Sequence, residues 1–367
     1  MSAERATTPT DVIRDAEHGR YSVDRESLGR VLRGEPRYRV DQVWEGLYRL
    51  GGEPREWTAL PAALRGVIEL ALPRELTGVA ESISDDGSTV KFLWELEPTG
   101  RVETVLMLYP DRATVCVSSQ AGCAMACGFC ATGQAGFTRH LTVGEIVEQV
   151  AVTRDRARSM GRRLSNVVFM GMGEPLANER ALWPAVERIH GEFGLSARHV
   201  TVSTVGLVPG IRRLAEHPLP VNLAVSLHAA DDELRNTLVP INRRHPIDEL
   251  VDACAEYVSR RRRRLSFEWA MIDGVNDRAV DAERLAGLCR RMRPAAHVNL
   301  IPLNPTPGYP TRGTPMARVR EFHQRLVSLG VNATVRRNRG TDIDAACGQL
   351  AAGHPITISP RRRGDDR

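Results

Sequence analysis

The chain is poor in lysine, in aromatic residues and in long apolar runs. Lys91 is the single lysine among 50 basic residues, so 49 are arginine, and aromatic residues make up 5% of the 367 residues. No apolar run approaches the length of a membrane span, and the N-terminal residues lack the apolar core of a signal peptide. We therefore expect no membrane association and a cytoplasmic location. The net charge of +5 is compatible with a nucleic-acid partner, but so mild an excess does not identify one.

Four of the seven cysteines lie between Cys116 and Cys130, and the last three, Cys123, Cys127 and Cys130, have the spacing C-x3-C-x2-C. Thiolates are soft ligands that suit iron–sulfur clusters and zinc. Three thiolates would hold a 4Fe–4S cluster and leave one iron open for another ligand. A structural zinc site needs four protein ligands, so Cys116 or His140 would have to complete it. The spacing favours the cluster and leaves zinc as the alternative.

The periodicity of apolar residues divides the chain into five parts. Residues 1–20 are polar and predict a flexible tail, and residues 21–76 follow a helical pattern typical of a small accessory domain. Residues 77–108 alternate with period two, which predicts a β-hairpin extension. An α/β core over residues 109–346 and a C-terminal segment over 347–367 complete the chain.

Strand-like and helical runs alternate through the α/β core. Six such units predict parallel strands with right-handed crossovers, too few for a closed eightfold barrel. The predicted fold is therefore a partial, open (β/α)6 barrel. The expected strands are residues 113–119, 166–170, 199–203, 221–227, 265–272 and 297–303, with a further strand at 333–338. The expected helices are 142–158, which Thr142 and Glu145 would open as a capping box, then 179–193, 208–217, 247–262, 279–293 and 316–329.

Polar residues and glycines follow the predicted strands where each strand ends. In parallel α/β folds ligands bind at the carboxyl ends of the strands, so these residues predict one binding site. Each turn taken alone is more often structural. The residues are Gly171, Gly173 and Glu174 after the second strand, Ser203 and Gly206 after the third, Ser226 and His228 after the fourth, and Asn304 after the sixth.

The remaining cysteines divide into two kinds. Cys254 and Cys289 lie on apolar helical faces and are predicted to be core residues. Cys347 lies among small and acidic residues beyond the last predicted strand, which indicates an accessible thiol. The basic run 260–264 ends a predicted helix, where a solvated helix end is the simpler interpretation and phosphate contact the alternative.

These motifs together resemble those of the ribosomal RNA large subunit methyltransferase N (RlmN) family of the radical S-adenosylmethionine (SAM) superfamily. The resemblance extends from about Tyr38 to Leu350, with one departure at Thr341, where an acidic residue is expected. The motifs are Arg101-Val-Glu103-Thr, Cys116-Val-Ser-Ser-Gln, the three-cysteine motif, Gly-Met-Gly-Glu174-Pro-Leu, Ser226-Leu-His228, Asn304-Pro and Asp-Ile-Asp-Ala-Ala-Cys347-Gly-Gln-Leu.

The resemblance implies methylation of carbon 2 of an adenine in the peptidyl-transferase loop of 23S rRNA and of an adenine next to the anticodon in tRNAs. It implies a 4Fe–4S cluster, two SAM molecules per turnover (one methyl donor, one radical source), an electron donor such as flavodoxin, and a monomer. Cys347 would carry the methyl group, Cys116 would resolve the intermediate by forming a disulfide, and Glu103 would accept a proton. The implied cluster ligands are Cys123, Cys127 and Cys130, and the implied SAM contacts are Gly173, Glu174, Ser203, Ser226, Leu227, His228 and Asn304.

Three other functions remain open on these residues. The related adenine carbon 8 methyltransferases of antibiotic resistance share both catalytic cysteines. A radical SAM activase or small-molecule enzyme needs the cluster but not the pair Cys347 and Cys116. A zinc-bound RNA-binding module would need neither the cluster nor the thiol chemistry.

Overall fold

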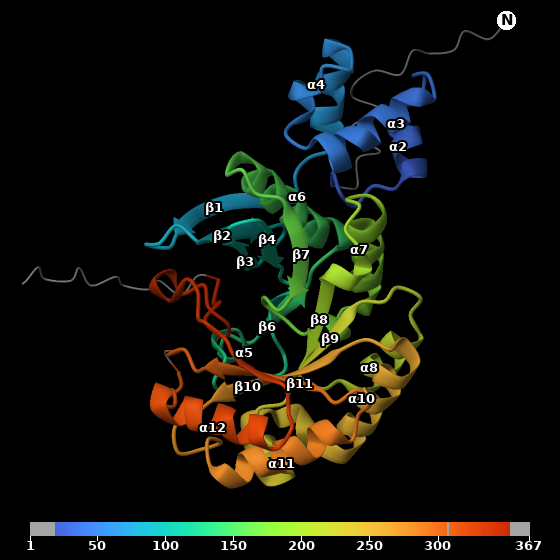
Figure 1. Cartoon of the computed structure of the whole chain (residues 1–367). Helices are drawn as coiled ribbons and strands as arrows, with labels where there is room; N and C mark the ends of the chain where they lie inside the picture. Colours follow the sequence, from blue (N-terminus) through green and yellow to red (C-terminus); the bar gives the residue numbers. More distant parts are fainter. Residues whose placement is uncertain (1–18, 307, 353–367) are drawn as a thin grey trace, which may run out of the picture.

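The structure is a computed structural model that describes residues 19–306 and 308–352 (Figure 1). Most of the expected N-terminal tail and the basic end of the C-terminal segment, including Arg361–Arg363, lie outside the described residues. At the top of Figure 1 a group of short helices forms the accessory part predicted for residues 21–76. These are α2 (Arg25–Val31), α3 (Tyr38–Glu45), a π-helical turn (Gly46–Leu50), a 3-10 turn (Pro54–Glu56) and α4 (Ala62–Ala71).

The accessory helices are joined to the core by buried apolar side chains and by specific hydrogen bonds. The indole Nε1 of Trp44 donates to Oε2 of Glu192 at 2.6 Å, and the backbone N–H of Gly52 donates to Asp155 at 3.0 Å. Leu47 and Ile68 are fully buried in an apolar core that continues into the α/β part. The division of the chain into separate domains therefore stays a prediction.

The extension has three antiparallel strands, one more than a single hairpin. β1 (Leu76–Ile83) pairs with β2 (Thr89–Leu96), and β2 pairs with β3 (Arg101–Leu108). β3 in turn pairs with the first strand of the core, with Val105 opposite Cys116. The extension and the core thus form one continuous sheet, whose strand order is β1-β2-β3-β4-β7-β8-β9-β10-β11-β12.

From β4 to β12 every neighbouring pair of strands is parallel. The two outer strands of the described sheet, β1 and β12, do not pair with each other, so the barrel is open as predicted. The strands end within a few residues of the predicted positions because their apolar runs are short and clearly bounded. They are β4 (Ala113–Cys116), β7 (Leu164–Phe169), β8 (Val200–Thr204), β9 (Asn222–Ser226), β10 (Leu265–Met271), β11 (His297–Pro302) and β12 (Ala333–Val335).

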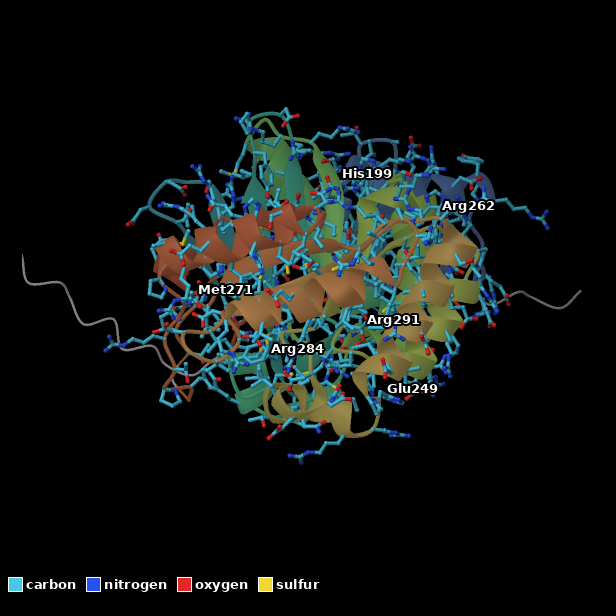
Figure 2. All side chains as sticks on the ribbon, turned by 60° about the horizontal axis from the view of Figure 1, so that its bottom comes forward. His199, Glu249, Arg262, Met271, Arg284 and Arg291 are labelled. Atoms are coloured by element: carbon cyan, nitrogen blue, oxygen red, sulfur yellow. The ribbon has the colours of Figure 1, made fainter. Side chains whose placement is uncertain are left out.

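Helices follow the parallel strands and cover the outside of the sheet. Figure 2 shows Glu249, Arg284 and Arg291 on this outer layer, which is charged toward solvent. The helices are α6 (Val143–Ser159), α7 (Glu179–Gly191), α8 (Val208–Glu216), α9 (Asp232–Leu238), α10 (Ile247–Arg261), α11 (Ala279–Arg290) and α12 (Met316–Ser328). None of the helices in the described ranges is long and apolar enough to cross a membrane.

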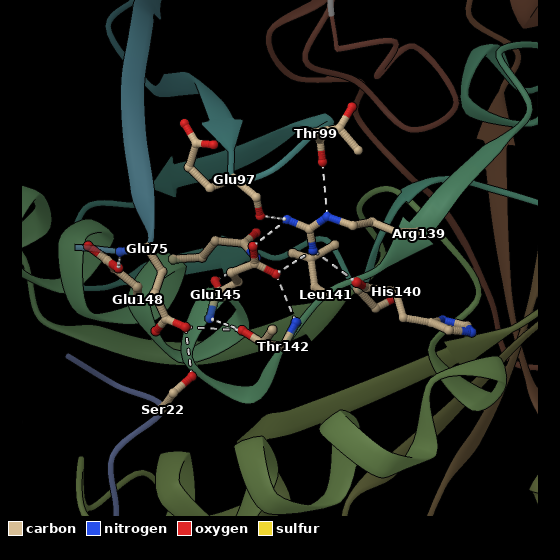
Figure 3. A network of polar contacts seen from close by, with 12 residues as sticks. Ser22, Glu75, Glu97, Thr99, Arg139, His140, Leu141, Thr142, Glu145 and Glu148 are labelled. Carbon is tan, nitrogen blue, oxygen red and sulfur yellow. Dashed lines mark hydrogen bonds and ion pairs between the residues drawn. The ribbon is translucent and has the colours of Figure 1, made fainter. Parts of the chain in front are cut away.

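The start of α6 confirms the predicted capping box. The Thr142 hydroxyl accepts from the backbone N–H of Glu145 at 3.1 Å, and the Glu145 carboxylate accepts from the N–H of Thr142 at 2.8 Å. Arg139 holds both oxygens of the same carboxylate, at 2.6 and 2.9 Å, and also donates to the backbone carbonyls of Glu97 and Thr99 (Figure 3). This network fixes α6 against the extension.

Candidate active site

The three clustered cysteines lie on a loop that turns back between β4 and α6. A small second sheet, β5 (Gln120–Gly122) with β6 (Phe137–His140), and a short helix α5 (Ala131–Gln134) shape this loop. Cys123, Cys127 and Cys130 line one cavity of about 520 Å³ at the carboxyl ends of the parallel strands. All three border the space that a cluster held by three thiolates would occupy, although no three metal-ligating side chains of the described residues already lie at metal-binding distance from one another.

The environment of the cysteines is mostly apolar. Burial raises the pKa of Cys123 to about 11 and also raises the pKa of Cys127. Without a metal these groups are neutral thiols, and metal binding would displace their protons. Phe129, 9% exposed, packs beside them and meets the His228 ring edge-on at 4.8 Å. His140, the alternative zinc ligand, contacts Gln120 on the small sheet and is not among the residues that line the cavity.

The motif Gly171-Met-Gly-Glu174 follows β7 and packs tightly against the start of the cysteine loop. Gly173 has φ +98°, and a Cβ there would lie 2.5 Å from the side chain of Gln120. The Glu174 carboxylate lies on the cavity wall and accepts from the backbone N–H groups of Leu176 (3.1 Å) and Val205 (2.8 Å). Burial is the largest cause that raises the pKa of Glu174 to about 7. Glu174 thus positions the β7 and β8 loops as well as facing the cavity.

His228 lies directly after β9 with φ +58° and faces the cavity. Its Nδ1 accepts from the backbone N–H of Ala270 at 2.9 Å, which assigns the ring proton to Nε2. Burial, followed by the charge of Arg235, lowers the pKa of His228 to about 3. His228 is therefore a neutral donor through Nε2 at physiological pH.

Ser203, Ser226 and Asn304 also line the cavity, as expected from their positions at strand ends. Leu227 does not line it, because its side chain is fully buried in the core. The backbone of Leu227 forms hydrogen bonds within the fold. Its N–H donates to the backbone carbonyl of Glu268, and its carbonyl accepts from the side chain of Arg235.

Arg235 is a fully buried residue that the sequence pattern does not indicate. Its guanidinium donates to the carbonyls of Leu227 (3.0 Å), Val205 (2.7 Å) and Ser226 (3.2 Å), and to Asn242 (2.7 Å). It therefore ties the ends of β8 and β9 to helix α9. Because α9 has only seven residues, it is too short for a helical periodicity of apolar residues to be recognised in the sequence.

Cys347 is exposed on the wall of the same cavity, which agrees with the accessible thiol predicted. Three neighbours hold the segment in place. The Asn304 side chain donates to the carbonyl of Cys347 (3.0 Å), the Ala131 N–H donates to Gly348 (2.8 Å), and the Thr132 hydroxyl donates to Leu350 (2.6 Å). Two of these contacts come from the residues that directly follow Cys130, so the cysteine loop and the Cys347 segment are positioned together.

Cys116 also lines this cavity, whereas its neighbours Val115 and Val117 are buried in the core. This confirms the alternation expected along β4. Both thiols are free in the structure. Burial, and next the charge of Cys347, raise the pKa of Cys116 to about 12, so it is a neutral thiol near pH 7. Cys254 and Cys289, in contrast, are completely buried in the apolar core, as predicted.

Glu103 is not among the residues that line the cavity. Its Oε1 pairs with Nζ of Lys91 at 2.9 Å, and its Oε2 accepts from the backbone N–H groups of Ala351 (2.8 Å) and Ala352 (3.1 Å). Lys91 also donates to the carbonyl of Asp344 at 3.4 Å. Lys91 and Glu103 therefore form a clasp. Lys91 contacts the Cys347 segment before the cysteine, at Asp344, and Glu103 contacts it after the cysteine, at Ala351 and Ala352.

Comparisons with known proteins agree with this geometry. Residues 117–286 match the family model of the radical SAM superfamily. A protein of Corynebacterium diphtheriae with the name "Probable dual-specificity RNA methyltransferase RlmN" is 52% identical over 326 residues, which cover 87% of this chain and 89% of that protein. A protein of Salinispora tropica with the same name is 53% identical over 330 residues, with 87% and 88% covered. The chain belongs to the RlmN family.

It is therefore a radical SAM enzyme that methylates RNA, and its superfamily implies a 4Fe–4S cluster and SAM. A solved structure supports the fold: a radical SAM methyltransferase from Sphaerobacter thermophilus is 50% identical, with a TM-score of 0.87 over 92% of this chain and 100% of that one. The predicted family and fold class are thus confirmed.

Proposed function

We propose that this RlmN family member methylates carbon 2 of an adenine in the peptidyl-transferase loop of 23S rRNA and of an adenine next to the anticodon in tRNAs, through an S-methylated Cys347. The observation that supports this most is the shared cavity. Cys347 and Cys116 line the same space as Cys123, Cys127 and Cys130, so thiol chemistry and cluster chemistry can act on one substrate. A radical SAM activase needs no such second pair of thiols.

Within this proposal the chain binds two groups. Cys123, Cys127 and Cys130 would hold the 4Fe–4S cluster, and Gly173, Glu174, Ser203, Ser226, His228 and Asn304 would contact SAM, whereas Leu227 lies behind the cavity wall. When bound, the cluster supplies the electron that cleaves SAM to a carbon radical. The neutral Nε2–H of His228 would donate a hydrogen bond to SAM without adding a positive charge beside its sulfonium.

Cys347 would first accept the methyl group. Its thiolate forms the S–CH3 bond by displacement, and S-adenosylhomocysteine leaves with the electron pair of the broken bond. Cys347 is exposed only to the cavity, whose walls shield its thiol from bulk water and so raise its pKa, and the guanidinium of Arg336 opposes that increase. Arg336 is held near the thiol by its backbone N–H, which donates to Leu300 at 2.8 Å, and by Glu268 at 3.5 Å.

The S-methyl group of Cys347 would then lose a hydrogen atom to the radical that the bound cluster and a second SAM supply, and its methylene carbon would add to the adenine. A base would take the proton from carbon 2, and Cys116, after losing its own proton, would attack the sulfur of Cys347. The S–S bond would form as the C–S bond to the product breaks, the released methylene group would take up a proton to become the methyl group, and the surplus electron would return to the redox partner. An electron donor such as flavodoxin is part of the proposal, because the disulfide must be reduced before the next turnover.

Glu103 is the proposed proton acceptor, but both of its oxygens are occupied in the structure by Lys91 and by the backbone of Ala351 and Ala352. It can take up a proton only after residues 351–352 move away. The contacts of Glu103 hold the Cys347 segment in place, and proton acceptance would be a second, catalytic role.

Mass spectrometry of adenosines tests the proposal. RNA from a strain that lacks this gene is incubated with reconstituted enzyme, SAM and a reductant. The expected product is 2-methyladenosine in 23S rRNA and in tRNA. Formation of 8-methyladenosine would establish the alternative reaction, and unmodified adenosine in an enzyme that cleaves SAM would contradict RNA methylation.

A further inference from the structure

A second cavity of about 550 Å³ lies beside the active site, on the side of the extension. Its walls come from the β1–β2 turn, the end of β3, and the segments after α6 and β12. Tyr109 and Arg339 line both cavities, so the two spaces are neighbours along the same rim. The remaining lining residues are Asp86, Gly87, Ser88, Leu108, Pro110, Met160 and Arg162.

The arginines of this cavity are fixed by backbone carbonyls and not by carboxylates. Nε of Arg162 donates to the carbonyl of Tyr109 at 2.9 Å, and NH1 of Arg339 donates to that of Leu108 at 3.2 Å. Neither forms an ion pair within the described part of the chain. A guanidinium has five N–H donors, so both residues keep donors for a ligand together with their full positive charge.

The ring of Tyr109 fixes the orientation of two guanidinium groups. The guanidinium groups of Arg112 and Arg339 lie over its ring, at 4.6 and 4.5 Å from the ring centroid. Stacking on an aromatic face holds a guanidinium plane in a fixed direction, which reduces the entropy lost when it binds an oxyanion. A fixed guanidinium is a good ligand for the two oxygens of a phosphate.

The position of the second cavity beside the active site indicates which anion it would bind. A target adenine must leave its stack and enter the cavity that Cys347 and Cys116 line. The phosphates on either side of that nucleotide then have to lie on the rim, within a few ångströms of the entrance. Tyr109 and Arg339 occupy that rim, and Arg162 is the next cation along the second cavity.

We propose that this second cavity is a substrate subsite that binds the RNA backbone next to the flipped adenine, with Arg162 and Arg339 on its phosphates. The inference rests on the proposed methylation of adenine for the identity of the entering base. The subsite positions RNA by charge and does not read sequence, because its donors are aimed at phosphate oxygens and no base edge is required.

One acidic residue lies in the same wall and is consistent with this assignment. The Asp86 carboxylate is occupied by its own turn, where it accepts from the hydroxyls of Ser84 (2.7 Å) and Ser88 (2.8 Å) and from the backbone N–H of Ser88 (2.9 Å). The hydrogen bond from Ser84 is the largest of the causes that lower the pKa of Asp86 to about 2. Its charge shapes the turn and forms no ion pair with Arg162 or Arg339 within the described residues, although Arg339 is close enough to add a smaller contribution to this decrease.

The test is the salt dependence of RNA binding. The double variant Arg162→Gln/Arg339→Gln is purified with its cluster, and its affinity for a 23S rRNA fragment that contains the target loop is measured between 50 and 200 mM KCl. Each phosphate contact contributes roughly 0.7 to 0.9 to the slope of log K against log salt. We expect the slope to decrease by about 1.5 and affinity at 0.1 M salt to fall by about 5- to 8-fold for each contact, equally for unrelated RNA sequences.

The double variant Arg262→Gln/Arg264→Gln is the matched control. It also removes two charges, from exposed residues just before the amino end of β10 at the edge of the sheet opposite the active site, and should leave the slope unchanged and the affinity within about 2-fold of wild type. The variant Arg162→Lys/Arg339→Lys keeps the charges and should retain the slope, which separates charge from folding. An unchanged slope in the glutamine variant, with its melting temperature also unchanged, would overturn the subsite.

Two further outcomes are distinguishable: one would assign the second cavity to another partner, and the other would refute the proposed methylation. If the glutamine variant binds RNA normally but accepts electrons from reduced flavodoxin more slowly, while dithionite reduces it as fast as wild type, the second cavity binds an acidic protein and the RNA subsite is wrong. If wild type binds RNA with the expected slope but methylates no adenine, the proposed function fails, and the phosphate subsite stands on its own.

Discussion

The clasp formed by Lys91 and Glu103 makes a quantitative prediction. In Lys91→Met the Glu103 carboxylate loses its cation but stays in a site where only 7% of its side chain is exposed. Removal of one partner from such a charge-assisted hydrogen bond costs about 2 kcal/mol, less than for a fully buried pair because two backbone N–H groups still contact Glu103. The cost should appear as local opening of residues 344–352, since Leu350 is the only large apolar side chain that this described segment buries, beside Ala345 and Ala346.

Hydrogen exchange measures that opening, because the Cys347 thiol is already exposed while the segment is closed. A cost of about 2 kcal/mol corresponds to roughly 30-fold more frequent opening, so the amide hydrogens of a peptide over residues 341–352 should exchange about 30-fold faster in Lys91→Met than in wild type, with lower RNA methylation. The melting temperature should change by only a few degrees, because the core is untouched.

Arg101→Met is the control for this experiment. Arg101 pairs with Glu95 across the same two strands at 3.2 Å, but both side chains are about half exposed. Such a surface pair contributes less than about 1 kcal/mol, and hydrogen exchange over residues 341–352 should not change. Equal exchange and equal methylation in Lys91→Met and wild type would refute the clasp.

Three other changes test the thiols and one buried acid. Cys116→Ala should accumulate a covalent protein–RNA adduct through Cys347 on denaturing gels, removed by nuclease, and a fully active variant would refute the resolving role. Arg336→Met should raise the pKa of Cys347 and slow its alkylation at pH 8 several-fold, because the cation that favours the thiolate is removed. Arg337→Met, at the exposed neighbour, should change neither, and equal effects of the two variants would contradict the role of Arg336. Burial raises the pKa of Glu148 from 4.5 to about 7, so the folded protein holds a proton there, and the resulting stability is present at low pH and lost as pH rises through 7. Glu148→Gln should therefore gain stability relative to wild type between pH 5 and 8, by up to about 2–3 kcal/mol in denaturant unfolding, and a difference that is constant with pH would contradict this.

The parallel strands and the longer helices were predictable because their signals are local. The apolar run Leu265–Met271 and the capping box at Thr142 depend on neighbours in the sequence, and both agree with the structure. The convergence of strand ends then follows from parallel topology alone. This is why Glu174, Ser226 and His228 could be assigned to one site before any coordinates were known.

The parts that could not be predicted depend on contacts between distant segments. Lys91 is separated from Asp344 by 253 positions, and nothing near it in the sequence indicates that it holds the Cys347 segment. Arg235 is a charged residue in a short helix, and charged residues usually face solvent, yet it is fully buried and donates to carbonyls at the ends of two strands. For Leu227 the alternation of β9 already turns the side chain into the core, and its backbone N–H and carbonyl are paired with Glu268 and Arg235, so the expected SAM contact is not formed by this residue.

The most direct test of the central claim follows the methyl group itself. Enzyme that carries an unlabelled methyl group on Cys347 is incubated with RNA and SAM labelled as CD3 on its methyl group, and the product of the first turnover is analysed by mass spectrometry. Transfer through Cys347 predicts that this first 2-methyladenosine contains the unlabelled carbon from the protein and no CD3 group. A first product that carries the intact CD3 group would show direct transfer from SAM and would contradict the role of Cys347 as methyl carrier.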